Sequence, residues 1–68
     1  MLSIRERRKA KHLSQHDLAS QIGVNQTAIS QWERGVTMPT LDKAAMIAEV
    51  LDCTIDELCG RGKENKNV

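Results

Sequence analysis

The chain has 68 residues, enough for one small domain, and its 40% apolar content is normal for a globular protein, which argues against disorder. Trp32 is the only aromatic residue, so we expect an aliphatic, helical core rather than a β-sandwich. The longest uninterrupted apolar run, residues 44–48, is far too short to cross a bilayer, so neither a membrane span nor a signal peptide is predicted.

The net charge of +1 does not by itself point to a nucleic-acid partner, but the charges are unevenly distributed along the chain. Residues 1–34 hold six Lys and Arg against three Asp and Glu, a net +3, whereas residues 35–68 hold four against six, a net −2. The N-terminal half is therefore the basic one, which is a weak indication of a polyanionic partner on that side.

Two capping boxes are predicted near the start of the chain. In Ser3–Glu6 and in Ser14–Asp17, a serine hydroxyl and a carboxylate can each satisfy an orphan backbone amide. These boxes predict helices over residues 4–11 and 15–22, and the second helix should stop at Gly23 because glycine tolerates the left-handed conformation found there.

A third helix is predicted over residues 26–34, with Asn25 as its N-cap and Gly35 as its stop. Its apolar residues share one side of the helix at about 100° per residue: Ala28, Ile29 and Trp32. Only residues 23–25 separate this helix from the one before it, and such a short, glycine-containing connection predicts a helix-turn-helix.

The opposite face of this third helix carries hydrogen-bonding groups and no formal charge: Gln26, Thr27, Ser30 and Gln31. Side chains that read base edges in a major groove are often Gln, Asn, Thr and Ser. Glutamine offers an acceptor and two donors in one plane, which matches the N6/N7 edge of adenine, and a threonine methyl group can pack on thymine. Taken alone, the pattern leaves an ordinary solvated face as an equal alternative.

A fourth helix is predicted after a non-helical link that contains Pro39. Thr40 caps this helix, which should run to about Leu51 and stop at Asp52. Its expected apolar stripe is close to an i, i+3, i+4, i+7 pattern: Leu41, Ala44, Ala45, Ile47, Ala48 and Leu51.

A last short helix is predicted from a capping box at Thr54–Glu57 to residue 59. Residues 60–68 are polar and interrupted by glycine, so we expect a disordered tail and a folded domain over residues 1–59. No strand signal appears, and the fold class expected is all-α with five short helices.

The cysteines and histidines indicate neither a disulfide framework nor a metal site. Cys53 and Cys59 are too few and too close together for a framework, and reduced thiols in a cytoplasmic protein are expected. The order and spacing of His12, His16 and the two cysteines fit no compact zinc module. No nucleophile–base pair, carboxylate pair or glycine-rich phosphate loop is found, so neither an enzyme nor a cofactor or small-molecule ligand is predicted.

A series of ordered positions resembles a known family: Leu13–Gln15, Leu18, Ala19, Ile22–Val24, Ile29, Ser30, Trp32–Gly35, Pro39 and Leu51. Over residues 2–59, the chain resembles the Cro/CI-type (xenobiotic-response-element, lambda-repressor-like) helix-turn-helix family. The resemblance implies a compact five-helix DNA-binding domain whose third helix enters the major groove of double-stranded DNA. It matches Gln26, Thr27, Ser30 and Gln31 to base-facing or groove-facing positions.

The resemblance also implies which residues hold the DNA backbone. Gln15 matches a position that contacts the backbone or supports the base contacts, while Arg34 and the link Thr37–Thr40 match phosphate-side positions. In addition, the exposed amides of the helix N-termini at Ser14 and Thr40 can bind phosphate without a cation.

Glu33 lies in the last turn of the third helix, where the helix dipole disfavours an anion, so a cationic partner is expected. The resemblance suggests Arg8 of the first helix, whose guanidinium would tie the two helices together and direct spare donors at a phosphate. Arg34 is adjacent in sequence, but neighbouring side chains on a helix diverge. The other cations of the first helix point in several directions and most are expected to be solvated: Arg5, Arg7, Lys9 and Lys11.

Three positions depart from the family's pattern. Arg7 stands where many members have leucine, whereas His12 and Asp52 stand where many have glycine. His12 is expected in the left-handed conformation that ends the first helix. The departures bear on the packing of the first helix and not on the third.

The leading hypothesis is a sequence-specific transcriptional regulator, a repressor that occupies an operator. One helix reads only a few base pairs, so we expect a homodimer on a palindromic site with half-sites about one helical turn, ~34 Å, apart. Met46 and Val50 on the fourth helix fit a dimer patch and partial burial equally well. A chain ending at residue 68 is expected to be a stand-alone regulator or one domain of a larger repressor. The alternative is a protein-interaction module such as an antitoxin, with or without DNA binding.

Overall fold

The computed structural model describes residues 2–59. Five helices make up this part of the chain: α1 (Ile4–Ala10), α2 (Gln15–Ile22), α3 (Gln26–Arg34), α4 (Leu41–Val50) and α5 (Ile55–Leu58). The predicted all-α fold is confirmed, although α1, α4 and α5 each end one residue earlier than expected. No helix within the described range is long and apolar enough to cross a membrane. The predicted tail, residues 60–68, lies outside the described residues.

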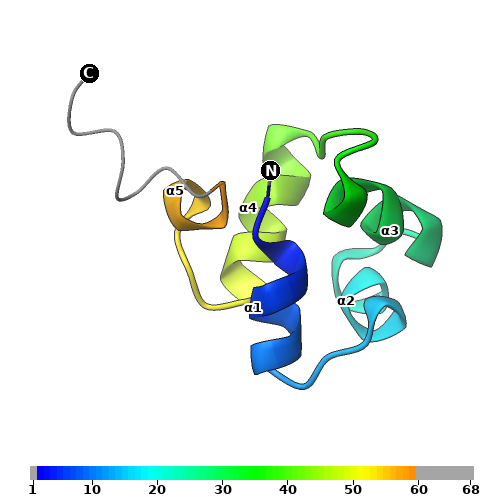
Figure 1. The fold of residues 1–68 in the computed structure, drawn as a ribbon, viewed down its shortest axis with the longest axis horizontal. Helices are drawn as coiled ribbons and strands as arrows, with labels where there is room; N and C mark the ends of the chain where they lie inside the picture. The colour runs from blue at the N-terminus through cyan, green and yellow to red at the C-terminus, as the bar shows by residue number, and fades with distance from the viewer. Residues whose placement is uncertain (1, 60–68) are drawn as a thin grey trace.

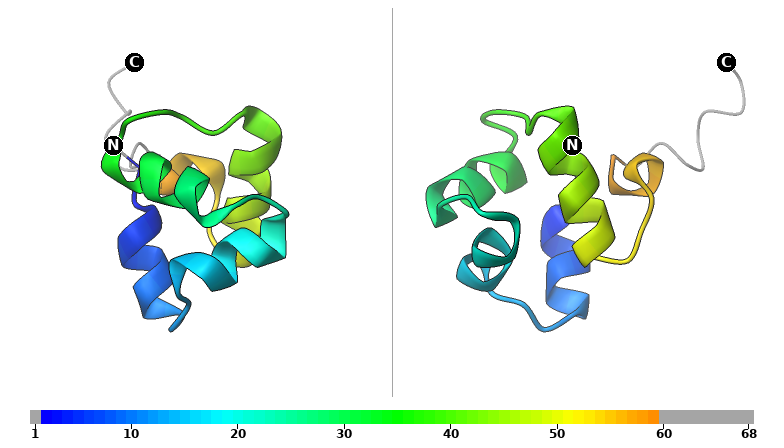
Figure 2. Two further views of the ribbon diagram at one scale, coloured as in Figure 1. Left: turned by 90° about the vertical axis from the view of Figure 1, so that its right-hand side faces the viewer. Right: turned by 180° about the vertical axis from the view of Figure 1, so that it is seen from behind.

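The helix-turn-helix pair lies on one side of the molecule. Figure 1 shows α2 and α3 next to each other on that side, with α1 and α4 in the middle and α5 on the far side of α4. Figure 2 shows the same order from two other directions, with α2 and α3 nearest the viewer in its left panel. The two helices therefore form an outer face, and α5 lies away from it.

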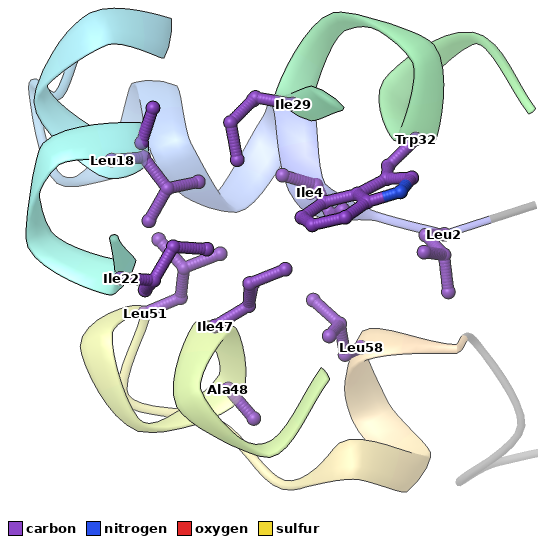
Figure 3. Close-up of a cluster of buried hydrophobic side chains, with 11 residues drawn as sticks. Leu2, Ile4, Leu18, Ile22, Ile29, Trp32, Ile47, Ala48, Leu51 and Leu58 are labelled. Atoms are coloured by element: carbon purple, nitrogen blue, oxygen red, sulfur yellow. The ribbon is translucent and has the colours of Figure 1, made fainter. Parts of the chain in front are cut away.

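Side chains from all five helices meet in one aliphatic core (Figure 3). Its members are Leu2, Ile4, Leu18, Ala19, Ile22, Ile29, Trp32, Ile47, Ala48, Leu51 and Leu58. Trp32 is only 8% exposed, which confirms that it is a core residue. Because α3 contributes both Ile29 and Trp32, burying its apolar side fixes which side of this helix faces outward.

The predicted apolar stripe of α4 is wrong at two positions. Leu41 is 73% exposed and Ala45 is also exposed, whereas Ala44, Ile47 and Ala48 are buried as expected. The first turn of α4 extends past the other helices (Figure 2), and Leu41 in that turn stays exposed although its spacing is correct.

Side-chain caps begin four of the helices as predicted. Both halves of the capping box are present at Ser14–Asp17 and at Thr54–Glu57. Asn25 accepts a hydrogen bond from the Ala28 amide at 2.9 Å, and Thr40 accepts one from the Lys43 amide at 3.3 Å. These contacts satisfy amides that the first helical turn leaves without an intrahelical partner.

The predicted capping box at Ser3–Glu6 is wrong. Ser3 makes no side-chain cap, and its hydroxyl instead donates to the Leu58 carbonyl at 3.0 Å while its amide donates to the same oxygen at 2.8 Å. Arg7 is not simply solvated either, because its Nε donates to Ser3 Oγ at 2.9 Å and its guanidinium reaches the Glu57 carbonyl. Ser3 and Arg7 thus join α1 to the C-terminal end of α5, where carbonyls lack helical partners.

Within residues 2–59, four residues adopt left-handed backbone conformations at the turns. Gly23 and Gly35 have φ of 78° and 76° and end α2 and α3 as predicted. His12 has φ of 59°, as expected, and Asp52 has φ of 61°. Residues other than glycine are strained in this conformation, so glycine would be the more favourable residue at positions 12 and 52.

Candidate nucleic-acid interface

The polar side of α3 faces away from the core. Gln26 and Thr27 are exposed, and Ser30 and Gln31 are half-buried. The helix is held in place by the Asn25 cap at one end and the left-handed Gly35 at the other. An uncharged, hydrogen-bonding face is therefore presented on a helix whose rotation is set by core packing.

Three of the four predicted base-facing residues border one shallow, open hollow. Gln26, Thr27 and Ser30 line it together with Gln15 from the start of α2. Gln31 is not among the lining residues. The helix-turn-helix geometry thus brings Gln15 beside the outer face of α3, as its predicted supporting role requires.

A buried ion pair joins α1 to α3 behind this face. Arg8 Nε donates to Glu33 Oε2 at 2.7 Å and its terminal nitrogen to Oε1 at 3.3 Å, a two-point contact. The side chains of Arg8 and Glu33 are only 10% and 5% exposed. A third hydrogen bond, 2.8 Å long, runs from Arg8 to the Leu13 carbonyl. The predicted Arg8–Glu33 tie is confirmed, and these contacts direct the guanidinium inward.

Burial and hydrogen bonding shift the pKa of the Glu33 carboxyl group in opposite directions. Desolvation by burial would raise the pKa of its carboxyl group, but hydrogen bonds from Arg8 and Gln15 and the charges of Arg8 and Arg5 outweigh it. The net result is a pKa below the ordinary value, so Glu33 is ionised at neutral pH.

A chain of hydrogen bonds continues from Glu33 to the outer face. Gln15 Nε2 donates to Glu33 Oε1 at 3.0 Å, and Gln26 Nε2 donates to Gln15 Oε1 at 3.2 Å. We call Arg8, Glu33, Gln15 and Gln26 the polar relay. It runs from a buried guanidinium on α1 to an exposed amide on α3 and so links the core to the outer face.

The relay was only partly accessible from the sequence. Family resemblance supplied the Arg8–Glu33 tie, but nothing in the pattern pointed to the contacts of Gln15 with Glu33 and Gln26. Glu33 and Gln26 lie 18 and 11 residues after Gln15 in the sequence, on the other side of the turn between α2 and α3. Helical periodicity places residues on a face of their own helix, and only the crossing of two helices brings such side chains together.

The first turn of α2 is fixed next to the hollow. The Ser14 hydroxyl accepts from the Asp17 amide at 2.9 Å, and Asp17 accepts from the Ser14 amide at 3.0 Å. The pKa of the Asp17 carboxyl group is lowered, chiefly by the hydrogen bond from the Ser14 backbone amide and to a smaller extent by the Ser14 side chain. Ser14 itself is exposed, so the N-terminal end of α2 remains open to a partner.

The residues predicted on the phosphate side lie in and around the link between α3 and α4. Arg34, Thr37 and Thr40 are all exposed. The link also exposes Val36 and Met38, at 58% and 67%. Because residues 35–40 carry no charge, Arg34 is the cation nearest to this link in sequence.

Within residues 2–59, no three His, Cys, Asp or Glu side chains lie close enough to hold a metal ion. Cys53 and Cys59 are free thiols and half-buried. Desolvation by burial raises the pKa of the Cys53 thiol, which keeps it protonated at neutral pH.

Comparison with protein families finds that a helix-turn-helix family model matches residues 4–58. The chain is 37% identical over 70 residues to the cryptic phage CTXphi transcriptional repressor RstR of Vibrio cholerae, covering 97% of this chain and 62% of RstR. It is 40% identical over 55 residues to the transcriptional activator BcrR of Enterococcus faecalis, covering 81% of this chain and 27% of BcrR. The chain thus spans less than two thirds of the length of both relatives.

Comparison with solved structures finds the same architecture. The crystal structure of the c2 repressor of Salmonella phage P22, in complex with a synthetic operator, superposes with a TM-score of 0.81 at 38% identity. The match covers 85% of this chain and 88% of that one. The five helices are therefore arranged as in a repressor domain that has been crystallised on its operator.

Proposed function

The chain belongs to the Cro/CI-type helix-turn-helix family, and we propose that it is a sequence-specific regulator of transcription that binds double-stranded DNA. The observation that carries the proposal is the polar relay: an uncharged reading face whose supporting glutamine is tied to a buried ion pair. A merely solvated helix face needs no such support from the core. The family comprises DNA-binding regulators, which are not enzymes.

Four residues of α3 contact bases in this proposal: Gln26, Thr27, Ser30 and Gln31. Gln26 and Thr27 are the most exposed of these and lie at the start of α3, which is the end that enters the major groove in helix-turn-helix proteins. Gln31 lies outside the hollow that the other three share with Gln15. We therefore expect Gln26 to dominate base selection and Gln31 to have a smaller effect.

Phosphate contacts come from both sides of the reading helix. On one side lie Ser14 and Gln15, at the N-terminal end of α2, where backbone amides attract an anion. On the other side lie Arg34, Thr37 and Thr40. Arg8 supports the interface through Glu33, since its donors are directed at Glu33 and the Leu13 carbonyl.

The regulator acts as a homodimer on a palindromic operator, because one reading helix covers too few base pairs for useful selectivity. Met46 is 38% exposed and Val50 is half-buried, packed against the core. Of the two, Met46 is the better candidate for a dimer contact. We propose repression by occupying the operator, as the name of the phage relative RstR suggests, although BcrR is named an activator.

Selection from a pool of random duplexes at about 0.15 M salt tests the proposal. We expect the selected sequences to share one site with two related halves. Equal binding to all duplexes would contradict sequence-specific regulation and favour a protein-interaction role instead. The salt concentration must be fixed, because contacts with phosphate make affinity strongly salt-dependent.

Substitution on α3 then tests the base-reading assignment. Gln26→Ala should reduce the preference at one base position in each half-site by about 1–3 kcal/mol. Gln21→Ala is a matched control, because Gln21 is an exposed glutamine on α2 that does not line the hollow. A uniform loss of affinity for all sequences in Gln26→Ala would mean that Gln26 holds the backbone rather than a base.

A further inference from the structure

An open groove runs between α4 and α5. It consists of two adjoining hollows of about 400 and 420 Å³ that share lining residues. Figure 1 shows α5 on the far side of α4 from α2 and α3, so the groove lies away from the proposed DNA interface. We call it the acidic groove, because its lining combines three carboxylates with apolar side chains: Glu49, Asp52, Glu57, Met46, Cys53 and Ile55.

Negative charge gathers at this groove, although the end of α4 does not favour it. Residues 44–59 contain four Asp and Glu and no Lys or Arg. Glu49 lies in the last turn of α4 and Asp52 just beyond it, where the partial negative charge of the helix end disfavours an anion. Carboxylates at such an end are stabilised only when a cation lies beside them.

The cations of α1 cover only part of the groove. Lys11 lies 3.7 Å from Asp52 in an exposed ion pair, which contributes little. Arg7 is directed at the Glu57 carbonyl at 3.3 Å, while the carboxylate of Glu57 accepts from the Thr54 amide at 2.9 Å. The groove therefore keeps an excess of negative charge.

Glu49 differs in this respect from Glu33. Glu33 also lies in the last turn of its helix, and there Arg8 supplies the cation at 2.7 Å. Among the residues that the structure describes, no salt bridge includes Glu49. A cation from another molecule would stabilise this position as Arg8 stabilises Glu33.

We propose that the acidic groove binds a short basic segment of a protein partner, with a Lys or Arg against Glu49 and an aliphatic side chain between Met46 and Ile55. Met46 is 38% exposed and Ile55 is half-buried, and the flexible side chain of methionine adapts to varied partners. Partner and second copy exclude each other wherever the copy binds through Met46.

Charge decides between the possible occupants of the acidic groove. A second copy related by a two-fold axis would bring like carboxylates together, and DNA is itself a polyanion. A basic segment instead pairs with the carboxylates while its aliphatic side chain covers the apolar residues. The inference goes beyond the proposed regulatory function, because it concerns a surface away from the reading helix.

A synthetic peptide tests the groove directly. The probe is a blocked peptide of about twelve residues, built from Lys, Leu and Ala with the Lys on one helical face. Its titration into the isotope-labelled protein at about 0.15 M salt should shift the amide signals of the groove residues, with a Kd below about 1 mM. The signals of Gln26 and Gln31 should not move, and a peptide with Glu in place of Lys should cause no shifts.

Charge reversal at Glu49 separates binding in the groove from general attraction to the protein. Glu49→Lys should weaken peptide binding by at least about fivefold, and it should fold because a cation suits the end of a helix. Asp42→Lys is the control on the same helix, about 10 Å further along it and outside the groove, and should weaken binding less than about twofold. The neutral pair Glu49→Gln and Asp42→Asn should show the same order with smaller effects.

Four results would overturn the inference. Two are equal weakening by Glu49→Lys and Asp42→Lys, and shifts centred on α2 and α3. Groove shifts that appear without peptide as the protein concentration rises would identify a second copy as the occupant. Groove shifts on replacing the cations of residues 60–68 by Gln would identify the chain's own segment. The readout needs no DNA, so its result is independent of the proposed regulatory function.

Discussion

Arg8→Ala is the substitution that most directly tests how the interface is held. It removes three hydrogen bonds, two to Glu33 and one to the Leu13 carbonyl. It also leaves the Glu33 carboxylate, whose side chain is 5% exposed, with Gln15 as its remaining hydrogen-bond partner. Removing one member of a buried ion pair costs about 3–5 kcal/mol, mostly because the other charge stays buried without compensation.

That cost is large for so small a domain. A chain of 68 residues is expected to have a free energy of unfolding of about 3–10 kcal/mol. At about 4–8 °C per kcal/mol, the melting temperature of Arg8→Ala should fall by at least about 12 °C. Thermal unfolding followed by circular dichroism measures the change, and Lys9→Ala, at an exposed position of the same helix, is the control.

A double substitution and a stability threshold give two further tests at the Arg8 position. The double substitution Arg8→Met with Glu33→Leu should recover most of the lost stability, because an apolar pair leaves no charge unpaired. An Arg8→Ala protein as stable as Lys9→Ala, within about 0.5 kcal/mol, would refute the argument. So would an apolar double variant that is no more stable than Arg8→Ala.

Lowering the pH should weaken the stabilising contribution of Glu33 in the wild type and increase the stability of Arg8→Ala. In the wild type the folded-state pKa of Glu33 is below its ordinary value of 4.5, so its stabilising contribution is present above about that pH and is lost on further acidification. In Arg8→Ala, burial would prevail and raise the pKa of Glu33, so lowering the pH from 7 to 5 should recover part of the lost stability. A stability gap that stays constant between these pH values would contradict the assignment of charge to Glu33.

Three other substitutions test the scaffold by thermal unfolding. Asn25→Ala removes the cap of α3 and should cost about 1 kcal/mol, and no measurable change would mean that the hydrogen bond to Ala28 is not formed. His12→Gly should stabilise the fold by about 0.5–1 kcal/mol, because φ is 59° at that position. Lys11→Gly is the control and should destabilise the fold, because φ is −94° there. Equal effects of the two substitutions would refute the strain argument. Ile47→Ala should lower the free energy of unfolding by about 2–5 kcal/mol, because Ile47 is fully buried. Leu41→Ala should lower it by less than about 0.5 kcal/mol, because Leu41 is 73% exposed. A similar loss for both would place Leu41 in the core.

The sequence by itself determined where the helices lie, because helix ends depend on side chains close to them. The Asn25 cap, the Ser14–Asp17 box and the left-handed Gly23 and Gly35 are all local features, and all four are found in the structure. The buried side of α3 was also predictable, since Ile29 and Trp32 recur at the helical period. These features placed the polar side chains of α3 on the side of the helix that faces away from the core.

Only the tertiary structure decided which residues are buried and which residues of other helices they bond to. Ser3 has the sequence of a cap but bonds to the end of α5, and Leu41 has the spacing of a core residue but is 73% exposed. Gln15 contacts both Glu33 and Gln26 because α2 crosses α3 at that point. Sequence periodicity describes one helix at a time, whereas burial and hydrogen-bond polarity arise from neighbours that only packing supplies.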